Sequence, residues 1–127
     1  MNTDIGLKGS ADVSRSVIGA AFRVANCLGV GFLEKVYENA LAIELRLVGH
    51  DVEQQHAIDV RYRGEVVGIY QADLLVDDCL VIELKVAENL SRGHKAQCLN
   101  YLRATGLHTG LVINFGRPRL EIHRILS

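Results

Sequence analysis

The sequence lacks any excess of charge of one sign. Its 14 Lys and Arg residues nearly balance its 15 Asp and Glu residues, giving a formal net charge of -1. The chain therefore lacks the overall positive charge that is typical of many nucleic-acid-binding proteins. A small basic patch near a site can still attract a polyanion, because the local field matters more than the total charge. The charge balance is thus only weak evidence against a role on nucleic acids.

The sequence also lacks any pair of cysteines spaced as Cys-x-x-Cys, and its three cysteines are odd in number. Cys27, Cys79 and Cys98 fall in segments with helical or strand patterns, which indicates reduced, buried thiols. A structural zinc site or an iron–sulfur cluster held by four thiolates is therefore not expected.

Long apolar runs, repeats and low-complexity segments are absent as well. No run approaches the ~18 residues that a membrane-spanning helix needs, and the start MNTDIGLKGS contains no apolar signal segment. We therefore expect a cytoplasmic protein with no membrane partner. The 127 residues, 49% of them hydrophobic, suit one domain over residues 1–127, with residues 1–10 as a flexible N-terminal extension.

Hydrophobic periodicity predicts eight elements in the order helix, helix, strand, strand, strand, helix, strand, strand. Asp12 or Ser14 is placed to cap the first helix and Ser91 the third. This order predicts a mixed α/β fold with a central mixed sheet flanked by helices, and a parallel pair joined by the third helix. The expected helices are residues 11–28, 33–48 and 92–104, and the expected strands are residues 52–62, 66–76, 79–86, 110–115 and 120–126.

Two charged residues end an otherwise apolar strand. Glu83 and Lys85 follow Leu80 to Ile82 and, being two apart, share one face of the strand. Charge beside such an apolar run is costly unless it is paired or bound to a ligand. A surface ion pair and a functional site explain these two residues equally well.

Asp73 favours the functional site, because it interrupts the preceding apolar strand, which folds back at Asp77-Asp78. A two-residue turn would pair Asp73 with Ile82 and send the two carboxylates to opposite faces, whereas a three-residue loop would pair Asp73 with Glu83. A real site therefore predicts an odd-length loop or a bulge in this hairpin.

Carboxylates held this close repel each other unless a cation lies between them. Mg²⁺ suits the pair, because it binds through one or two carboxylates and keeps waters that phosphate oxygens can replace. Such a metal polarises a phosphodiester, while Lys85 holds or deprotonates the attacking water. Phosphodiester hydrolysis is the predicted reaction class.

Two helical segments add further candidates. Glu34 falls within the apolar stripe of the second helix, where a lone carboxylate needs a partner, although a dipole-stabilising role in the first turn is the alternative. On the third helix His94, Gln97 and Tyr101 form one stripe, which is either a solvated face or an overhang above the site. Gln97 is then placed to orient Lys85 or to contact a phosphate.

With these residues in view, the chain resembles the GxxExxY family of small bacterial and archaeal proteins, placed in the PD-(D/E)XK nuclease superfamily. The motif stands here as Gly31-x-x-Glu34-x-x-Tyr37, and the superfamily pattern stands as Asp73, then Glu83-Leu84-Lys85, then Gln97 with Tyr101. Asn26 departs from the family, whose members often carry His there.

The resemblance implies a restriction-endonuclease-like core and assigns roles to these residues. Asp73, Glu83 and the Leu84 carbonyl would bind the metal, with Glu34 as a further ligand, directly or through water. Lys85 would assist the nucleophile, and the Gln97–Tyr101 pair is similar to that of the exonuclease branch. We add Tyr37, His94 and Tyr101 as candidate substrate-binding residues.

The function expected from the sequence is a nuclease that depends on Mg²⁺, with Mn²⁺ as a substitute, and acts on DNA. The alternative is a nucleic-acid-binding or regulatory module that keeps the metal site but does not cut. A third reading is a structural partner protein whose buried charges form a satisfied network. A chain this small has little surface with which to hold a duplex, so a homodimer or a protein partner is also expected.

Overall fold

The computed structural model describes residues 9–127 and contains the eight elements in the predicted order. Most of the extension expected at residues 1–10 lies outside the described residues, and Ser10 is already helical. The elements are α1 (Ser10–Leu28), α2 (Glu34–Leu47), β1 (Val52–Tyr62), β2 (Glu65–Val76), β3 (Leu80–Lys85), α3 (Arg92–Thr105), β4 (Thr109–Asn114) and β5 (Glu121–Leu126).

The five strands form one mixed sheet in the order β1-β2-β3-β4-β5. β1, β2 and β3 make the predicted antiparallel meander. The chain then crosses over through α3, which brings β4 parallel to β3, and β5 returns antiparallel to β4. The parallel pair expected across the third helix is therefore confirmed.

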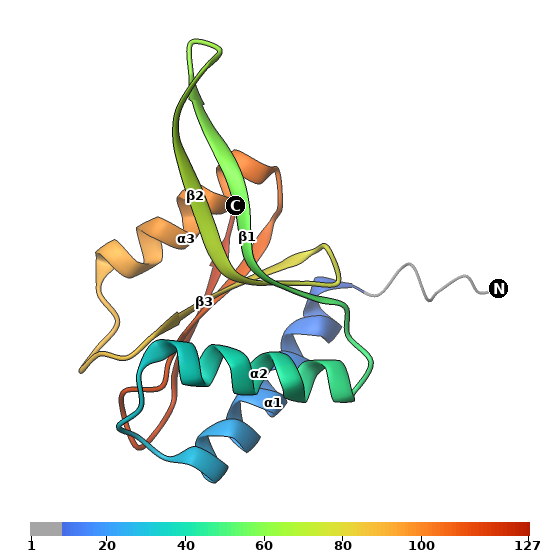
Figure 1. The fold of residues 1–127 in the computed structure, drawn as a ribbon, viewed down its shortest axis with the longest axis vertical. Coiled ribbons are helices and arrows are strands. Elements are labelled where there is room, and N and C mark those ends of the chain that lie inside the picture. Colours follow the sequence, from blue (N-terminus) through green and yellow to red (C-terminus); the bar gives the residue numbers. More distant parts are fainter. Residues whose placement is uncertain (1–8) are drawn as a thin grey trace, which may run out of the picture.

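Helices cover both faces of this sheet, with α1 and α2 on one side and α3 on the other (Figure 1). Because both faces are covered, the central strands β3 and β4 are buried almost throughout, and each contains an apolar run, residues 80–82 in β3 and residues 111–113 in β4. The sheet contributes Leu74, Val76, Leu80, Ile82, Leu84, Leu111 and Ile113 to the core under α1 and α2. On the other face, Ala72, Leu75, Val81 and Val112 pack with Cys98, Tyr101 and Leu102 of α3.

Tyr37 holds together the loop that joins α1 to α2. Its hydroxyl donates to the carbonyl oxygen of Gly29 at 2.6 Å and accepts from the backbone N–H of Phe32 at 3.3 Å. Its ring stacks on Phe115 with centroids 4.7 Å apart. Gly31 in this loop has φ 111°, a conformation that favours glycine.

The helix starts follow the predictions only in part. Neither Asp12 nor Ser14 caps α1, whose N-cap residue is Gly9, with no side-chain hydrogen bond. Ser14 is instead buried on the core side, and Asp12 pairs with Arg15 within the first turn. Ser91 does cap α3, and it forms a capping box with His94.

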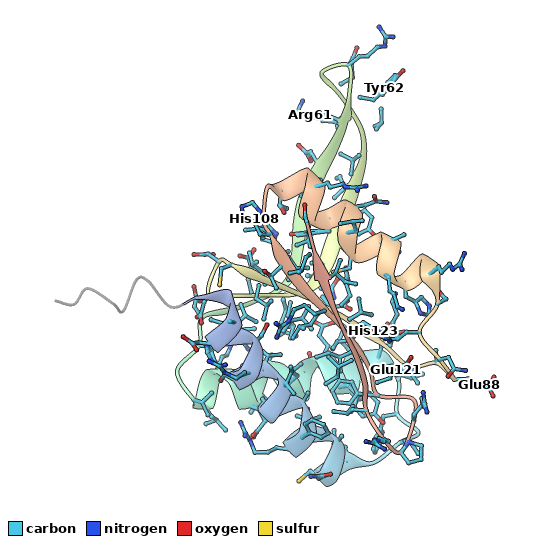
Figure 2. The ribbon with its side chains drawn as sticks, turned by 180° about the vertical axis from the view of Figure 1, so that it is seen from behind. Arg61, Tyr62, Glu88, His108, Glu121 and His123 are labelled. Atoms are coloured by element: carbon cyan, nitrogen blue, oxygen red, sulfur yellow. The ribbon has the colours of Figure 1, made fainter. Side chains whose placement is uncertain are left out.

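β1 and β2 form a long hairpin that extends beyond the helices (Figure 1). Its two-residue turn, Arg63-Gly64, has φ angles of 51° and 82°, as expected of a tight hairpin turn. Arg61 and Tyr62 lie near its end, far from the labelled residues of β5 (Figure 2). The half of the hairpin nearer the body of the protein contributes to the site.

Within residues 9–127, no helix is both long enough and apolar enough to span a membrane.

Candidate metal centre

The β2–β3 hairpin has the odd-length loop on which the predicted site depends. Three residues, 77–79, connect the strands, and the register pairs Val76 with Leu80 and Leu74 with Ile82. One step further along the same register, Asp73 lies opposite Glu83. Asp77 and Asp78 adopt left-handed φ angles of 52° and 56°, which let the chain reverse over three residues. The predicted loop geometry is therefore confirmed.

The carboxylate of Asp73 is held at both oxygens. Oδ2 accepts a hydrogen bond from the backbone N–H of Leu84 at 2.7 Å, and Oδ1 accepts one from the side-chain amide of Gln55 at 3.2 Å. The Leu84 contact lies beyond the last paired residues of β2 and β3, where the side chain of Asp73 takes the place of a ladder hydrogen bond. Asp73 is thereby fixed beside Glu83.

Glu83 is only 4% exposed, and its environment disfavours the charged form. Burial, and after it the neighbouring Asp73 carboxylate, raise the pKa of its carboxyl group from 4.5 to about 8, while Lys85 opposes the shift. A buried carboxyl beside a second carboxylate gains greatly from a cation placed between them. The two side chains and the nearby Leu84 carbonyl offer the all-oxygen donors that Mg²⁺ prefers.

Lys85 extends from the end of β3 towards α3, where its Nζ donates to Oε1 of Gln97 at 3.1 Å. Tyr70 of β2 supports the same turn of α3, because its hydroxyl donates to the Gln97 carbonyl oxygen at 3.1 Å. The predicted overhang of the third helix at Lys85 is thus present. Among the predicted residues, the structure brings Asp73, Glu83, Leu84, Lys85 and Gln97 together.

Glu34 does not occupy the buried position predicted for it. It is the first residue of α2 and is exposed to solvent, because the buried stripe of this helix begins only at Tyr37. The carboxylate buried on α2 belongs to Glu38, which is 3% exposed. Among residues 9–127, no group of three His, Cys, Asp or Glu side chains is placed to hold a metal ion, so a role for Glu34 as a ligand through water stays a prediction.

Glu38 is linked to the site through Gln55, and neither residue was identified from the sequence. Its Oε1 accepts from Gln55 at 2.8 Å and from Lys35 at 3.1 Å, and its Oε2 accepts from Gln54 at 2.8 Å. The same amide of Gln55 reaches Asp73. A signal for Glu38 exists in the sequence, since Leu41, Ala42 and Leu45 follow it at three, four and seven residues.

The residues predicted to contact substrate have structural roles here. Tyr37 and Tyr101 are 0% exposed, so neither ring lies on the surface. The Tyr101 hydroxyl is hydrogen-bonded to Nδ1 of His56 and lies 3.3 Å from the His56 carbonyl oxygen. His94 is half-buried, and its Nδ1 accepts from the backbone N–H of Ser91. The structure thus assigns both tyrosines to packing and internal hydrogen bonds, and their contact with substrate stays a prediction.

Comparison with known proteins agrees with this fold. Residues 11–125 match the PD-(D/E)XK nuclease superfamily, and the chain belongs to that superfamily. This match spans all the strands and helices that build the site. No curated protein matches the sequence.

The fold is similar to the crystal structure of SSO0001, with a TM-score of 0.58 at 19% sequence identity. The similar region covers 74% of this chain and 50% of that one. The chain thus matches half the length of that protein, and at this identity the likeness concerns the fold alone.

Proposed function

We propose that the protein is a divalent-metal-dependent nuclease that hydrolyses phosphodiester bonds in DNA, with Mg²⁺ as its metal and Mn²⁺ as a substitute. The observation that carries the proposal is the pairing of Asp73 with Glu83 across a three-residue loop. Membership of the PD-(D/E)XK nuclease superfamily supports the reaction class. The Gly31-x-x-Glu34-x-x-Tyr37 motif further supports a place in the GxxExxY family.

Asp73, Glu83 and the carbonyl oxygen of Leu84 would hold the metal. Such an ion supplies Lewis-acid stabilisation to a phosphate oxygen when it is bound. Ionisation of Glu83, which burial and Asp73 disfavour, becomes favourable beside a cation. The Leu84 and Gln55 hydrogen bonds each use one oxygen of Asp73, and a carboxylate oxygen can accept a second ligand beside such a bond.

Lys85 is the residue that acts on the nucleophile in this proposal. Its ammonium group donates to Gln97, which fixes the position of Nζ at the end of β3. From there Lys85 orients a water molecule and stabilises the negative charge that grows on the phosphate. Gln97 is therefore a positioning residue for Lys85, and its place on α3 depends on the Ser91 capping box.

A cleavage assay with metal and substrate panels tests this function. Purified protein with Mg²⁺ or Mn²⁺ is expected to cut at least one of single-stranded, double-stranded, nicked or branched DNA, with RNA as the comparison. Lys85→Ala should reduce the rate by at least ~100-fold, as expected when a positioned transition-state group is removed. Lys95→Ala removes the same charge from α3 and should change the rate by less than ~3-fold.

Two outcomes would contradict the proposal. If Mn²⁺ binds but every substrate stays intact, the chain is a non-cleaving nucleic-acid-binding or regulatory module. If cleavage persists unchanged in Lys85→Ala, the activity does not come from this site.

A further inference from the structure

We infer that Gln55 is a positioning residue of the candidate metal centre, which couples the buried carboxylate of Glu38 to Asp73 and sets the orientation of Asp73 before a metal binds. The inference rests on the proposed metal site. It concerns how this chain prepares that site, and it assigns a function to a glutamine on β1 and a glutamate on α2.

The backbone places Gln55 directly across from Asp73. The register of β1 and β2 pairs Gln54 with Leu74 and His56 with Ala72, so Gln55 and Asp73 face each other between these two pairs. Opposed residues on antiparallel strands present their side chains on the same face. The amide of Gln55 is thereby within reach of the Asp73 carboxylate, at 3.2 Å.

The backbone conformation of Gln55 is higher in energy than the extended conformation of a regular strand. Its φ is 53°, in the left-handed region that non-glycine residues rarely adopt, although it lies inside an 11-residue strand. Strain of this kind persists only where surrounding contacts over-determine it, and it concentrates at functional sites. Here the surrounding contacts are the hydrogen bonds to the two carboxylates.

The chemistry of the neighbours determines which way the Gln55 amide points. Its nitrogen lies 2.8 Å from Oε1 of Glu38 and 3.2 Å from Oδ1 of Asp73. A carboxylate only accepts hydrogen bonds, and a side-chain amide has two N–H donors on one nitrogen. Each donor is therefore directed at one carboxylate, and the flipped amide would place its oxygen against both.

The carboxylate of Glu38, which accepts a hydrogen bond from Gln55, is itself held in one orientation. It is 3% exposed and also accepts from Gln54 and Lys35, so its carboxylate cannot turn without losing several hydrogen bonds. Anchored in this way, Gln55 holds Oδ1 of Asp73 while the Leu84 N–H holds Oδ2. Both oxygens are fixed, and less conformational freedom is lost when a metal binds.

Gln55→Gly is the most direct test, because glycine accepts the left-handed φ while the side chain that joins the two carboxylates is lost. The variant is expected to remain folded, with a cooperative thermal unfolding transition, yet to bind Mn²⁺ about tenfold more weakly, as for other groups that orient metal ligands. Gln71→Ala removes an exposed glutamine from the same hairpin and should leave Mn²⁺ affinity unchanged. Titration followed by the EPR signal of free Mn²⁺ measures the affinity.

A second readout needs no metal. With Asp73 free to turn, the hydrogen bond from the Leu84 N–H weakens, so hydrogen exchange of this amide should accelerate in metal-free Gln55→Gly and not in Gln71→Ala. Unchanged exchange at Leu84 would show that Gln55 does not hold Asp73 in place, and would overturn the inference.

A double-mutant cycle distinguishes an effect of Glu38 that acts through Gln55 from an effect of the negative charge of Glu38 alone. If Glu38 acts through Gln55, Glu38→Gln lowers Mn²⁺ affinity in the wild type but causes no further loss in Gln55→Gly. An equal loss in both backgrounds would mean that Glu38 acts by its charge alone, which contradicts the coupling. If the wild type binds no Mn²⁺, the metal site of the proposed function fails instead, and the Leu84 exchange still tests the contact.

Discussion

The carboxylate of Asp73 accepts a hydrogen bond at 2.7 Å from the backbone N–H of Leu84, a residue eleven positions later in the chain. A side chain of β2 thus binds the backbone of β3 at the point where the ladder between the two strands ends. The contact fixes one carboxylate of the candidate site to the strand that carries the other carboxylate and Lys85.

Asp73→Asn should lower Mn²⁺ affinity by at least about tenfold, because the amide brings no charge and is a poorer ligand for a hard cation. Isothermal titration calorimetry measures the change. Asp78→Asn is the matched control, since Asp78 is exposed in the adjacent loop and Asn tolerates its left-handed φ of 56°. Equal losses of affinity in the two variants would place the metal elsewhere.

The stability of the metal-free protein should fall as the pH rises through the range set by Glu83. The pKa of this carboxyl is raised from 4.5 to about 8 by burial and by Asp73, so the folded protein binds a proton that the unfolded chain has released. The stabilisation is complete below pH 4.5 and is lost as the pH rises towards 8. Urea unfolding in EDTA between pH 5 and 8.5 should show a decrease on the order of a few kcal/mol.

Glu83→Gln provides the control for this pH dependence, because its neutral amide does not titrate. The variant should show a flatter pH profile than the wild type over the same range. Profiles that run parallel would assign the pH dependence to other groups.

His50→Ala should destabilise the fold by about 1–3 kcal/mol, the range for leaving buried polar groups without partners. His50 is 7% exposed and joins Ser16 of α1, at 2.7 Å, to Asp77 of the β2–β3 loop, at 2.6 Å. His108→Ala, at an exposed position, should change the urea midpoint little. A similar midpoint in both variants would show that this connection contributes no stability.

The connectivity of Ser16, His50 and Asp77 is that of a serine-hydrolase triad, but its setting is structural. Ser16 lies in the middle of α1, where the backbone N–H groups are used within the helix and are not available to stabilise an oxyanion. We therefore assign the three residues to holding α1 against the loops at this end of the sheet.

Gly116→Ala should be more damaging than Gly68→Ala. A Cβ at residue 116 would lie 2.6 Å from the carbonyl oxygen of Ala87, whose backbone is held at both ends by the Asn114 side chain. A Cβ at Gly68 meets nothing within 4 Å. The first change should cost about 1–3 kcal/mol in unfolding free energy and the second less than ~0.5 kcal/mol, and the reverse order would contradict this contact.

The order of the elements and the β2–β3 loop could be predicted from the sequence, because both depend on local patterns. Period-two and period-3.6 apolar spacing identifies strands and helices without knowledge of their neighbours. The requirement that Asp73 and Glu83 share a face then predicted an odd-length loop or a bulge, and residues 77–79 form an odd-length loop. Register is predictable wherever a slip of one residue would move charges into the core.

The sequence alone could not decide whether Glu34 or Glu38 is the carboxylate that α2 buries near the site. Glu34 and Glu38 are one helical turn apart, and both fit an apolar stripe along α2. Only the path of the chain before α2 decides between them, because it leaves the first turn exposed and buries the second. Burial depends on what packs against a helix face, which the periodicity of that helix does not contain.

By itself, the sequence determined the class of fold, the pair of carboxylates, and the lysine and glutamine that accompany them, because each follows from spacing along one or two elements. The tertiary structure decided that Glu38 rather than Glu34 is buried, that Tyr37 and Tyr101 support the fold from within, and that Gln55 joins α2 to Asp73. These relationships connect β1, α2 and α3 across the sheet. They depend on distances between elements and on one left-handed residue, neither of which is encoded in a local pattern.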